Sequence, residues 1–352
     1  MRRIALRVVA PILAVAAALA LLCHQELADW FAGRSSAPAL LAAVHAQDQK
    51  TDPTEAVKAL AEALKDKDAD VRRNAALSLG RIGKDARLAV PALTAALKDP
   101  EVDVRGASAL ALGRIGKDAA PAAAGLAELL KDKDRDVRSA AALALTRLGR
   151  EAKAAVPGLR EAAKGEDRQL QVYARGALVV LDEDPGPHVR VLAEALADKE
   201  VEVRGTAAYV LGELGPQARE AIPALIGALK DKDADVRKAV ARALGEMGSS
   251  GKSAAPALAQ ALKDENVGVA AAAAMALAEL GPDAAAAVAA LTEAVKSKEV
   301  ELRGAAVYAL GEIGPAARSA IPALTQALRD EDADVRKAAA LALGKIQNEA
   351  RD

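Results

Sequence analysis

The side chains that most often catalyse reactions or bind metals are scarce in this sequence of 352 residues. It contains one Cys and three His, and the residues after His24, His45 and His188 are Gln, Ala and Val, so no His-Glu metal motif occurs. A single Cys excludes an internal disulfide framework and a cysteine-rich zinc or iron–sulfur site. Gly-rich phosphate loops and Ser/His/Asp sets are also missing. We therefore expect a protein that is not an enzyme, with no catalytic site, no metal site and no cofactor.

One acidic cluster lies close to a histidine in the sequence. Asp182, Glu183 and Asp184 come shortly before His188, and two prolines stand between them. The prolines interrupt the helix that would bring carboxylate and imidazole ligands to one face. This stretch is therefore predicted to be a kink or hinge rather than a metal site.

The most repeated polar feature is an acidic residue followed by Val or Leu and then Arg, which recurs at the constant interval that separates Val71 from Val104. We expect each Arg to reach an Asp or a turn carbonyl of its own or a neighbouring repeat, forming a ladder. The Asp at each helix start is expected to cap N–H groups and to favour the helix dipole. A row of arginines that binds anions is the alternative. The predicted ladder consists of Asp70, Arg72, Asp103, Arg105, Asp136, Arg138, Arg204, Asp235, Arg237, Arg303, Asp334 and Arg336.

Each unit also carries the pattern of two helices. Counted from Val71, apolar residues at offsets 4, 8 and 11, the last being Ile82, form one stripe of an α-helix. Gly83 follows, where a helix C-cap favours positive φ. A second amphipathic stretch with a proline near its start, such as Pro91, completes the unit.

Nine such units without an insertion predict an all-α fold, an α-solenoid in which stacked helix pairs bury a continuous core. The repeats start near residues 54, 87, 120, 153, 186, 219, 252, 285 and 318. They occupy residues 54–347, preceded by a linker at 47–53 and followed by a tail at 348–352. Repeats four and seven depart from the pattern and are either hinges or degenerate copies.

These repeats resemble the HEAT family, and in particular the short HEAT-like repeats of bilin lyases. Pro in the first helix, Asp at the turn, Val-Arg opening the second helix and Ala-Leu-Gly near its end carry the resemblance. The unit, at about 33 residues, is shorter than the ~40–47 residues usual for HEAT. The resemblance implies that the second helices line a concave face. It also implies the alternative function, a bilin-lyase-like or other HEAT-type enzyme that handles a cofactor and has oxidoreductase or lyase activity.

Two rows of residues on the second helices form the candidate partner-binding surface. The row at offset 6 is mostly apolar, and it either forms a groove or is partly buried between helices. The row at offset 10 is basic in the first three repeats and acidic in the fifth to eighth. The acidic run is either a ridge that binds a basic partner or cations, or the result of duplicating one ancestral unit without selection for binding. The first row contributes Leu110, Leu143, Tyr209, Arg242, Met275 and Tyr308. The second row contributes Arg81, Arg114, Arg147, Glu213, Glu246, Glu279 and Glu312.

The two halves of the repeat region also differ in net charge, although the net charge of the whole chain is close to zero. The formal net charge is −1, whereas residues 54–182 carry +4 and residues 183–352 carry −6. A total near zero argues against bulk nucleic-acid binding. We therefore expect a non-catalytic scaffold or adaptor that binds a protein or peptide and no nucleic acid.

The first 46 residues have the pattern of an export segment. Arg2, Arg3 and Arg7 precede an uncharged apolar run at residues 8–23. That run is short for a membrane span of about 20 residues. Residues 1–46 are therefore predicted to be either a signal peptide or a membrane anchor, and the folded part is expected to be periplasmic or extracellular.

Overall fold

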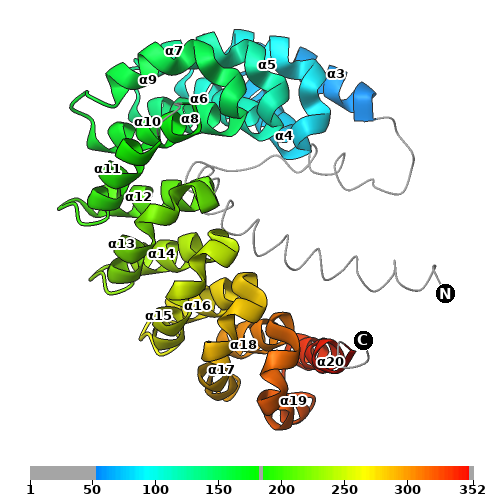
Figure 1. Cartoon of the computed structure of the whole chain (residues 1–352). Coiled ribbons are helices and arrows are strands. Elements are labelled where there is room, and N and C mark those ends of the chain that lie inside the picture. The colour runs from blue at the N-terminus through cyan, green and yellow to red at the C-terminus, as the bar shows by residue number, and fades with distance from the viewer. Residues whose placement is uncertain (1–52, 182–184, 349–352) are drawn as a thin grey trace. The chain divides into compact units, whose positions relative to one another are not determined.

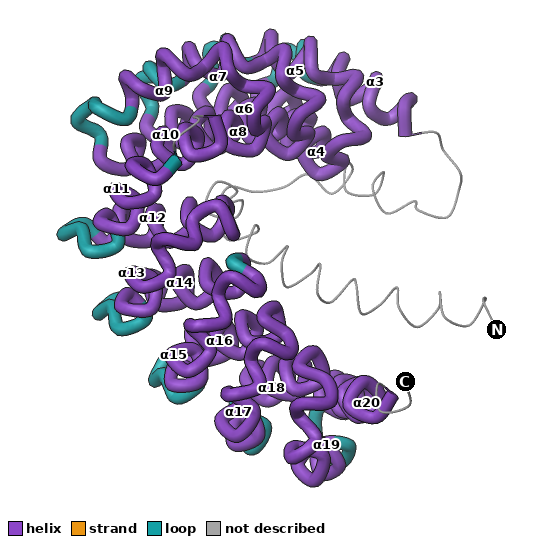
Figure 2. Tube along the Cα trace, in the orientation of Figure 1, coloured by secondary structure: helices purple, strands orange, loops and turns teal. Residues whose placement is uncertain are grey.

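The computed structural model describes residues 53–181 and 185–348, and every regular element within these ranges is a helix. The predicted export segment and the acidic residues 182–184 lie outside the described residues. Residues 53–352 form one unit, in which helix pairs stack side by side in chain order (Figure 1). Figure 2 shows that only short loops separate these helices. The predicted α-solenoid is confirmed.

Each repeat consists of a first helix and a longer second helix of 13–16 residues. The second helices are α4 (Ala69–Ile82), α6 (Val102–Ile115), α8 (Arg135–Leu148), α10 (Arg168–Leu181), α12 (Val201–Leu214), α14 (Ala234–Glu246), α16 (Val267–Leu280), α18 (Val300–Ile313) and α20 (Ala333–Asn348). The first helices are α3 (Pro53–Ala63), α5 (Val90–Ala96), α7 (Ala123–Leu129), α9 (Val156–Ala162), α11 (Gly186–Ala195), α13 (Ile222–Ala228), α15 (Ala255–Ala261), α17 (Val288–Ala294) and α19 (Ile321–Ala327).

A short 3₁₀ helix joins most second helices to the next first helix, where the sequence indicated only a glycine at the helix C-cap. Ala86 and Ala89 of the first such segment are fully buried, so the link crosses the edge of the core and only small side chains fit there. These segments are η1 (Gly83–Ala89), η2 (Gly116–Ala122), η3 (Gly149–Ala155), η4 (Gly215–Ala221), η5 (Gly248–Ala254), η6 (Gly281–Ala287) and η7 (Gly314–Ala320).

The glycine that opens each of these segments has the backbone conformation predicted for a helix C-cap. All seven have φ between 52° and 77°, a region that side chains with a Cβ rarely adopt. They are Gly83, Gly116, Gly149, Gly215, Gly248, Gly281 and Gly314.

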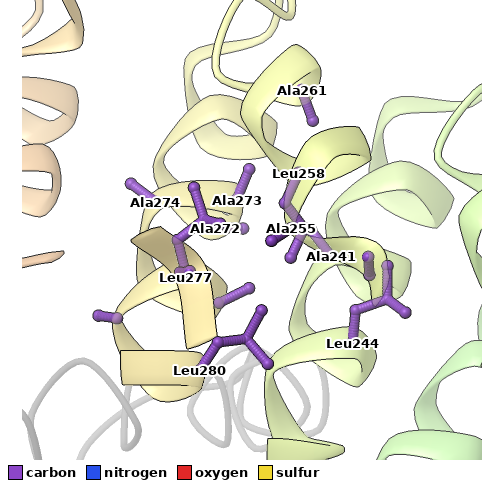
Figure 3. Packing of buried hydrophobic residues seen from close by; sticks show 14 of the residues in the cluster. Ala241, Leu244, Ala255, Leu258, Ala261, Ala272, Ala273, Ala274, Leu277 and Leu280 are labelled. Carbon is purple, nitrogen blue, oxygen red and sulfur yellow. The ribbon is translucent and has the colours of Figure 1, made fainter. Parts of the chain in front are cut away.

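The core consists of leucine, valine, isoleucine and alanine side chains between neighbouring helix pairs. Leu244, Leu258 and Leu277 are fully buried, and they lie together with Ala241 and Ala273 between α14, α15 and α16 (Figure 3). Burying one such leucine contributes about 1.5–3 kcal/mol. Small side chains let the helices approach closely, which explains why so few aromatic residues are needed.

The core divides into two clusters at α10. Leu178 belongs to the cluster of the first four repeats, Val172 and Val179 belong to the second cluster, and Tyr173 packs against both. The first helix that follows, α11, starts directly after Pro185, and no 3₁₀ segment precedes it within the described residues. The packing of the fourth repeat is therefore irregular, while the acidic residues of the predicted kink or hinge lie outside the described residues.

The seventh repeat, in contrast, keeps regular geometry. The Asn266 side chain caps α16 by accepting a hydrogen bond from the N–H of Val269 over 3.2 Å. The stretch Val267–Ala294, which spans α16, η6 and α17, is long and apolar enough to cross a membrane, and half of its apolar window is buried. Because α16 packs between α14 and α18, its alanines form part of the solenoid core.

Candidate partner-binding face

In five of the repeats the arginine ladder joins the second helix to the turn of the next repeat. Arg204 donates from Nε to Oδ2 of Asp231 over 2.6 Å, from Nη2 to Oδ1 over 3.0 Å, and from Nη1 to the carbonyl of Asp198 over 3.0 Å. Asp231 also accepts a hydrogen bond from the N–H of Asp233 over 2.9 Å, which fixes the turn into α14. Burial alone would raise the pKa of Asp231, but these hydrogen bonds lower it. The same paired contact occurs in Arg72–Asp99, Arg105–Asp132, Arg237–Asp264 and Arg303–Asp330.

The acidic partner in this ladder differs from the one that the sequence suggested. Asp70 precedes Arg72 by two residues on α4, and residues so spaced do not face each other on a helix. Asp70 instead lies 3.2 Å from Nη2 of Arg73, and the carboxylate that caps α4 belongs to Asp68. The same correction applies to Asp103, Asp136, Asp235 and Asp334, which lie in the first turns of their helices. The actual partners recur at the same interval as the arginines, so the sequence carried a signal for them.

In the seventh repeat both partners of the ladder are replaced together. Ala270 stands where the other repeats have Arg, except for the fourth, which has Gln171, and Ser297 stands where its Asp would be. A buried carboxylate without a counter-ion is strongly destabilising. The paired replacement therefore supports a structural role for the ladder over the anion-binding alternative.

The third and last repeats keep the arginine but change its acceptor. Gly165 occupies the usual Asp position in the third repeat, and Arg138 pairs with Asp167 over 2.6 Å instead. In the last repeat Arg336 donates to the carbonyl of Asp330 over 2.6 Å.

The second helices all lie on one side of the stack (Figure 1), and we call the surface formed by their offset 6 and offset 10 side chains the inner face. The offset 6 row is mostly half-buried rather than an open apolar groove. Leu143 is only 8% exposed, so it cannot present its side chain to a partner, whereas Leu341 in the last helix is 40% exposed. The half-buried members are Leu110, Tyr209, Arg242, Met275 and Tyr308.

A bridge of three side chains crosses the fourth repeat on the inner face. Arg147 of α8 donates from Nη2 to the hydroxyl of Tyr209 over 2.9 Å and to Oε1 of Glu213 over 2.8 Å. Its Nε donates to Oε2 of Glu213 over 3.1 Å, and the Tyr209 hydroxyl donates to Oε1 over 2.9 Å. Burial alone would lower the pKa of Arg147, but the contact with Glu213 raises it. Tyr209 and Glu213 belong to α12, so Arg147 reaches past α10.

Small side chains on α10 leave room for this bridge. The two inner-face positions of α10 hold Gly176 and Val180. A Cβ on Gly176 would collide with Cγ1 of Val210, so α12 approaches α10 closely at this point. Larger residues at these two positions would block the path of Arg147.

The basic half of the inner face contains arginines without counter-ions. Arg114 of α6 is half-buried, and the described part of the chain provides it with no hydrogen bond or ion pair. Burial and the charges of Arg147 and Arg81 lower the pKa of Arg114. Arg81 of α4 is exposed and likewise has no ion pair among the described residues. A half-buried guanidinium without an acceptor is unfavourable, and an anionic group near Arg114 would relieve this.

The acidic half shows the opposite arrangement. Glu246 of α14 and Glu279 of α16 extend over the preceding second helix, where a Cβ on Gly212 or Gly245 would collide with their Oε2 atoms. Both glutamates remain exposed, while the neighbouring helices partly desolvate their carboxylates. Burial, with the charges of Glu213 and Glu279, raises the pKa of Glu246 to about 7, and burial raises that of Glu279 to about 6. Within residues 53–181 and 185–348 neither forms an ion pair.

The outer two glutamates of this row are paired with cations. Glu312 forms an ion pair with Lys345 of α20, whose Nζ lies 5.9 Å from the ring centroid of Tyr308. Burial, together with the charge of Glu312, raises the pKa of Tyr308, whereas the hydroxyl of Tyr209 donates a hydrogen bond to Glu213 on α12. Within the described part of the chain, Glu246 and Glu279 are thereby left as the acidic side chains of this row without an ion pair.

The fold and this face define the chain as an α-solenoid with a structural arginine ladder and a charged inner face. The chain belongs to the HEAT-repeat family, whose model of HEAT repeats matches residues 25–112, 90–178, 189–278, 255–319 and 288–352. No curated protein matches the chain. A solved crystal structure of an engineered protein is 24% identical to it, with a TM-score of 0.46, and the match covers 82% of this chain and 88% of that chain. Among the described residues no group of three His, Cys, Asp or Glu is placed to hold a metal ion.

Proposed function

We propose that this protein is a non-catalytic scaffold that binds an extended segment of a partner protein along its inner face. One observation carries the proposal: Arg114, Glu246 and Glu279 lie on the same row of helices, and the described chain leaves their charges unpaired. The ladder arginines, in contrast, already form ion pairs and hydrogen bonds within the chain. Unpaired, partly desolvated charges become favourable when a partner of opposite charge neutralises them.

The stack supports this use of the inner face. Each repeat contacts mainly its neighbours, so the second helices present equivalent positions at regular intervals along one surface. A linear surface of this kind suits an extended partner segment, which meets each helix in turn.

A crosslinking experiment on the full chain tests the proposal. A photo-reactive amino acid is placed at Met275, a half-buried inner-face residue, or at Leu88, which is 55% exposed in η1 and does not belong to a second helix. We expect protein adducts from position 275 and few from position 88. Equal yields from the two positions would contradict binding along the inner face.

A matched pair of charge variants completes this experiment. The change Arg114→Gln with Glu246→Gln and Glu279→Gln should abolish the adducts. The control changes, Lys98→Gln with Glu128→Gln, remove an exposed ion pair of 3.4 Å between first-helix segments and should leave the adducts unchanged. Adducts that persist in the inner-face variant would overturn the proposal.

We also propose that the chain is exported or membrane-anchored, on the basis of the arginines and the apolar run in residues 1–46. Cell fractionation with N-terminal sequencing of the mature protein tests this proposal. The bilin-lyase-like alternative remains a prediction of the resemblance. An absorption spectrum and metal analysis of the purified chain test it, and a bound pigment or metal would favour it over the scaffold.

A further inference from the structure

Among the described residues, the offset 10 charges that lack an ion pair are divided by sign, while Arg242, an offset 6 cation on α14, lies close enough to Glu246 to lower its pKa and reduces the negative charge of that end by one. Arg81 and Arg114 lie on α4 and α6, whereas Glu246 and Glu279 lie on α14 and α16. Between the two groups, the bridge from Arg147 to α12 neutralises its own charges. The offset 10 row of the inner face therefore has a basic end, a neutral middle and an acidic end, and with Arg242 included the acidic end keeps a net negative charge.

We propose that the inner face binds an extended peptide segment with two blocks of charge: an acidic block over α4 and α6 and a basic block over α14 and α16. This inference rests on the proposed function and specifies the chemistry of the partner. It is argued from charge complementarity, because each block would neutralise side chains that the described chain leaves without an ion pair.

Helix spacing sets the spacing of charges within each block. Packed helices lie about 8–10 Å apart. An extended peptide advances about 3.1–3.3 Å per residue, so every third side chain meets the next helix. The acidic block is therefore expected to carry Asp or Glu at about every third position, and the basic block Lys or Arg at the same interval.

The distance between the two blocks follows from the same geometry. Going from α6 to α14 means passing α8, α10 and α12, which is four helix steps. At about 8–10 Å per step, the peptide spans about 32–40 Å, or about 10–12 residues in extended form. Because the bridge is neutral, this central part of the peptide needs no charge.

The division of charge also disfavours partners that carry only one sign of charge. A uniformly acidic polymer such as a nucleic acid would meet Glu246 and Glu279 with like charge, and a uniformly basic segment would meet Arg81 and Arg114. A face with one basic and one acidic end is also complementary to itself about a two-fold axis. A second copy of this chain is therefore the competing occupant that the experiment must separate.

The test uses the full chain and three fluorescein-labelled peptides of about 24 residues, matched to the helix spacing. One has three Glu at every third position, a neutral Ser/Pro/Gly spacer and three Lys at every third position. The second has the same composition with Glu and Lys alternating, and the third carries only Glu. Fluorescence anisotropy at low ionic strength should show that the block peptide binds about tenfold more tightly than the others.

Variants assign the two blocks to the two ends of the inner face. Arg81→Gln with Arg114→Gln, and Glu246→Gln with Glu279→Gln, should each weaken the block peptide by about fivefold. The control Lys98→Gln with Glu128→Gln should leave its affinity unchanged. A benzophenone at the acidic end should crosslink to α4 or α6, and crosslinking to α14 or α16 would overturn the proposed charge order.

The outcomes separate this inference from the proposed function. If the block and alternating peptides bind equally but still crosslink to second helices, the charge order is wrong and the scaffold stands. If no peptide crosslinks to a second helix, both are wrong. If sedimentation instead shows a salt-sensitive dimer that both glutamine variants disrupt, the inner face binds a second copy and the peptide proposal is overturned.

Discussion

Replacing Arg204 with alanine would leave the carboxylate of Asp231 in a sheltered turn without its counter-ion. The two side chains are 5% and 9% exposed. Exposed ion pairs contribute about 0.2–1 kcal/mol, and breaking a deeply buried pair costs about 3–5 kcal/mol. This pair is covered from solvent but lies in a turn at the edge of the stack. The cost of breaking it is therefore expected to lie between these two values. We therefore expect Arg204→Ala to lower the free energy of unfolding by about 2 kcal/mol.

The seventh repeat shows which second substitution should be combined with Arg204→Ala. Ala270 and Ser297 occupy the two ladder positions there, and the surrounding helices remain regular. Combining Arg204→Ala with Asp231→Ser should therefore destabilise the chain by about 1 kcal/mol less than the sum of the single changes. The second change removes a carboxylate that the first leaves unpaired.

Urea unfolding followed by circular dichroism measures these free energies. Since repeat arrays can unfold in parts, hydrogen exchange of the amides of α12 and α14 provides a local readout. Additive effects of the two changes in both measurements would refute the reasoning that the ladder acts as ion pairs between repeats.

Three further predictions concern the inner face. Gly212→Ala should destabilise the chain by about 1–3 kcal/mol, because the added Cβ would lie 3.1 Å from Cα of Ala243. The control Gly205→Ala lies in the same helix, where the added Cβ would meet no atom within 4 Å, and should stabilise the chain by about 0.5–1 kcal/mol. Equal effects of the two substitutions in thermal unfolding would refute the close approach of α14 to α12 at Gly212. Arg147→Gln should remove the bridge over α10 and speed hydrogen exchange in α12, and unchanged exchange would count against the bridge. Burial raises the pKa of Glu246 from 4.5 to about 7, so its carboxylate binds a proton more readily in the folded chain and stability falls as pH rises between these values. Because this side chain is exposed, Glu246→Gln should stabilise the chain by about 1 kcal/mol or less at pH 8 and by nothing near pH 4, and an unchanged pH profile would contradict this.

The repeat architecture could be predicted from the sequence because it depends on local periodicity. The stripe from Val71 to Ile82 and the glycine that follows it specify a helix and its end without reference to any other repeat. The same pattern in each successive unit then specifies the stack. The 3₁₀ segment after Gly83 was not predicted, because its buried alanines depend on the path that the chain takes across the core.

Contacts between repeats were harder to predict. The guanidinium of Arg72 pairs with Asp99 of the next repeat rather than Asp70, and this choice depends on how the repeats stack. The bridge from Arg147 spans two repeats and depends on the small residues of α10. The change from basic to acidic residues at offset 10 did indicate the division of charge, but not which charges remain unpaired.

Hydroxyl-radical footprinting of the full chain with and without the block peptide tests the central claim most directly. Met275 and Tyr308 are half-buried reporters on the inner face, while Leu88 in η1 and Leu328 after α19 are 55% and 39% exposed and do not belong to a second helix. We predict that the peptide slows oxidation of Met275 and Tyr308 and leaves both leucines unchanged. Protection of Leu88 or Leu328 with unchanged oxidation of Met275 and Tyr308 would contradict binding along the inner face.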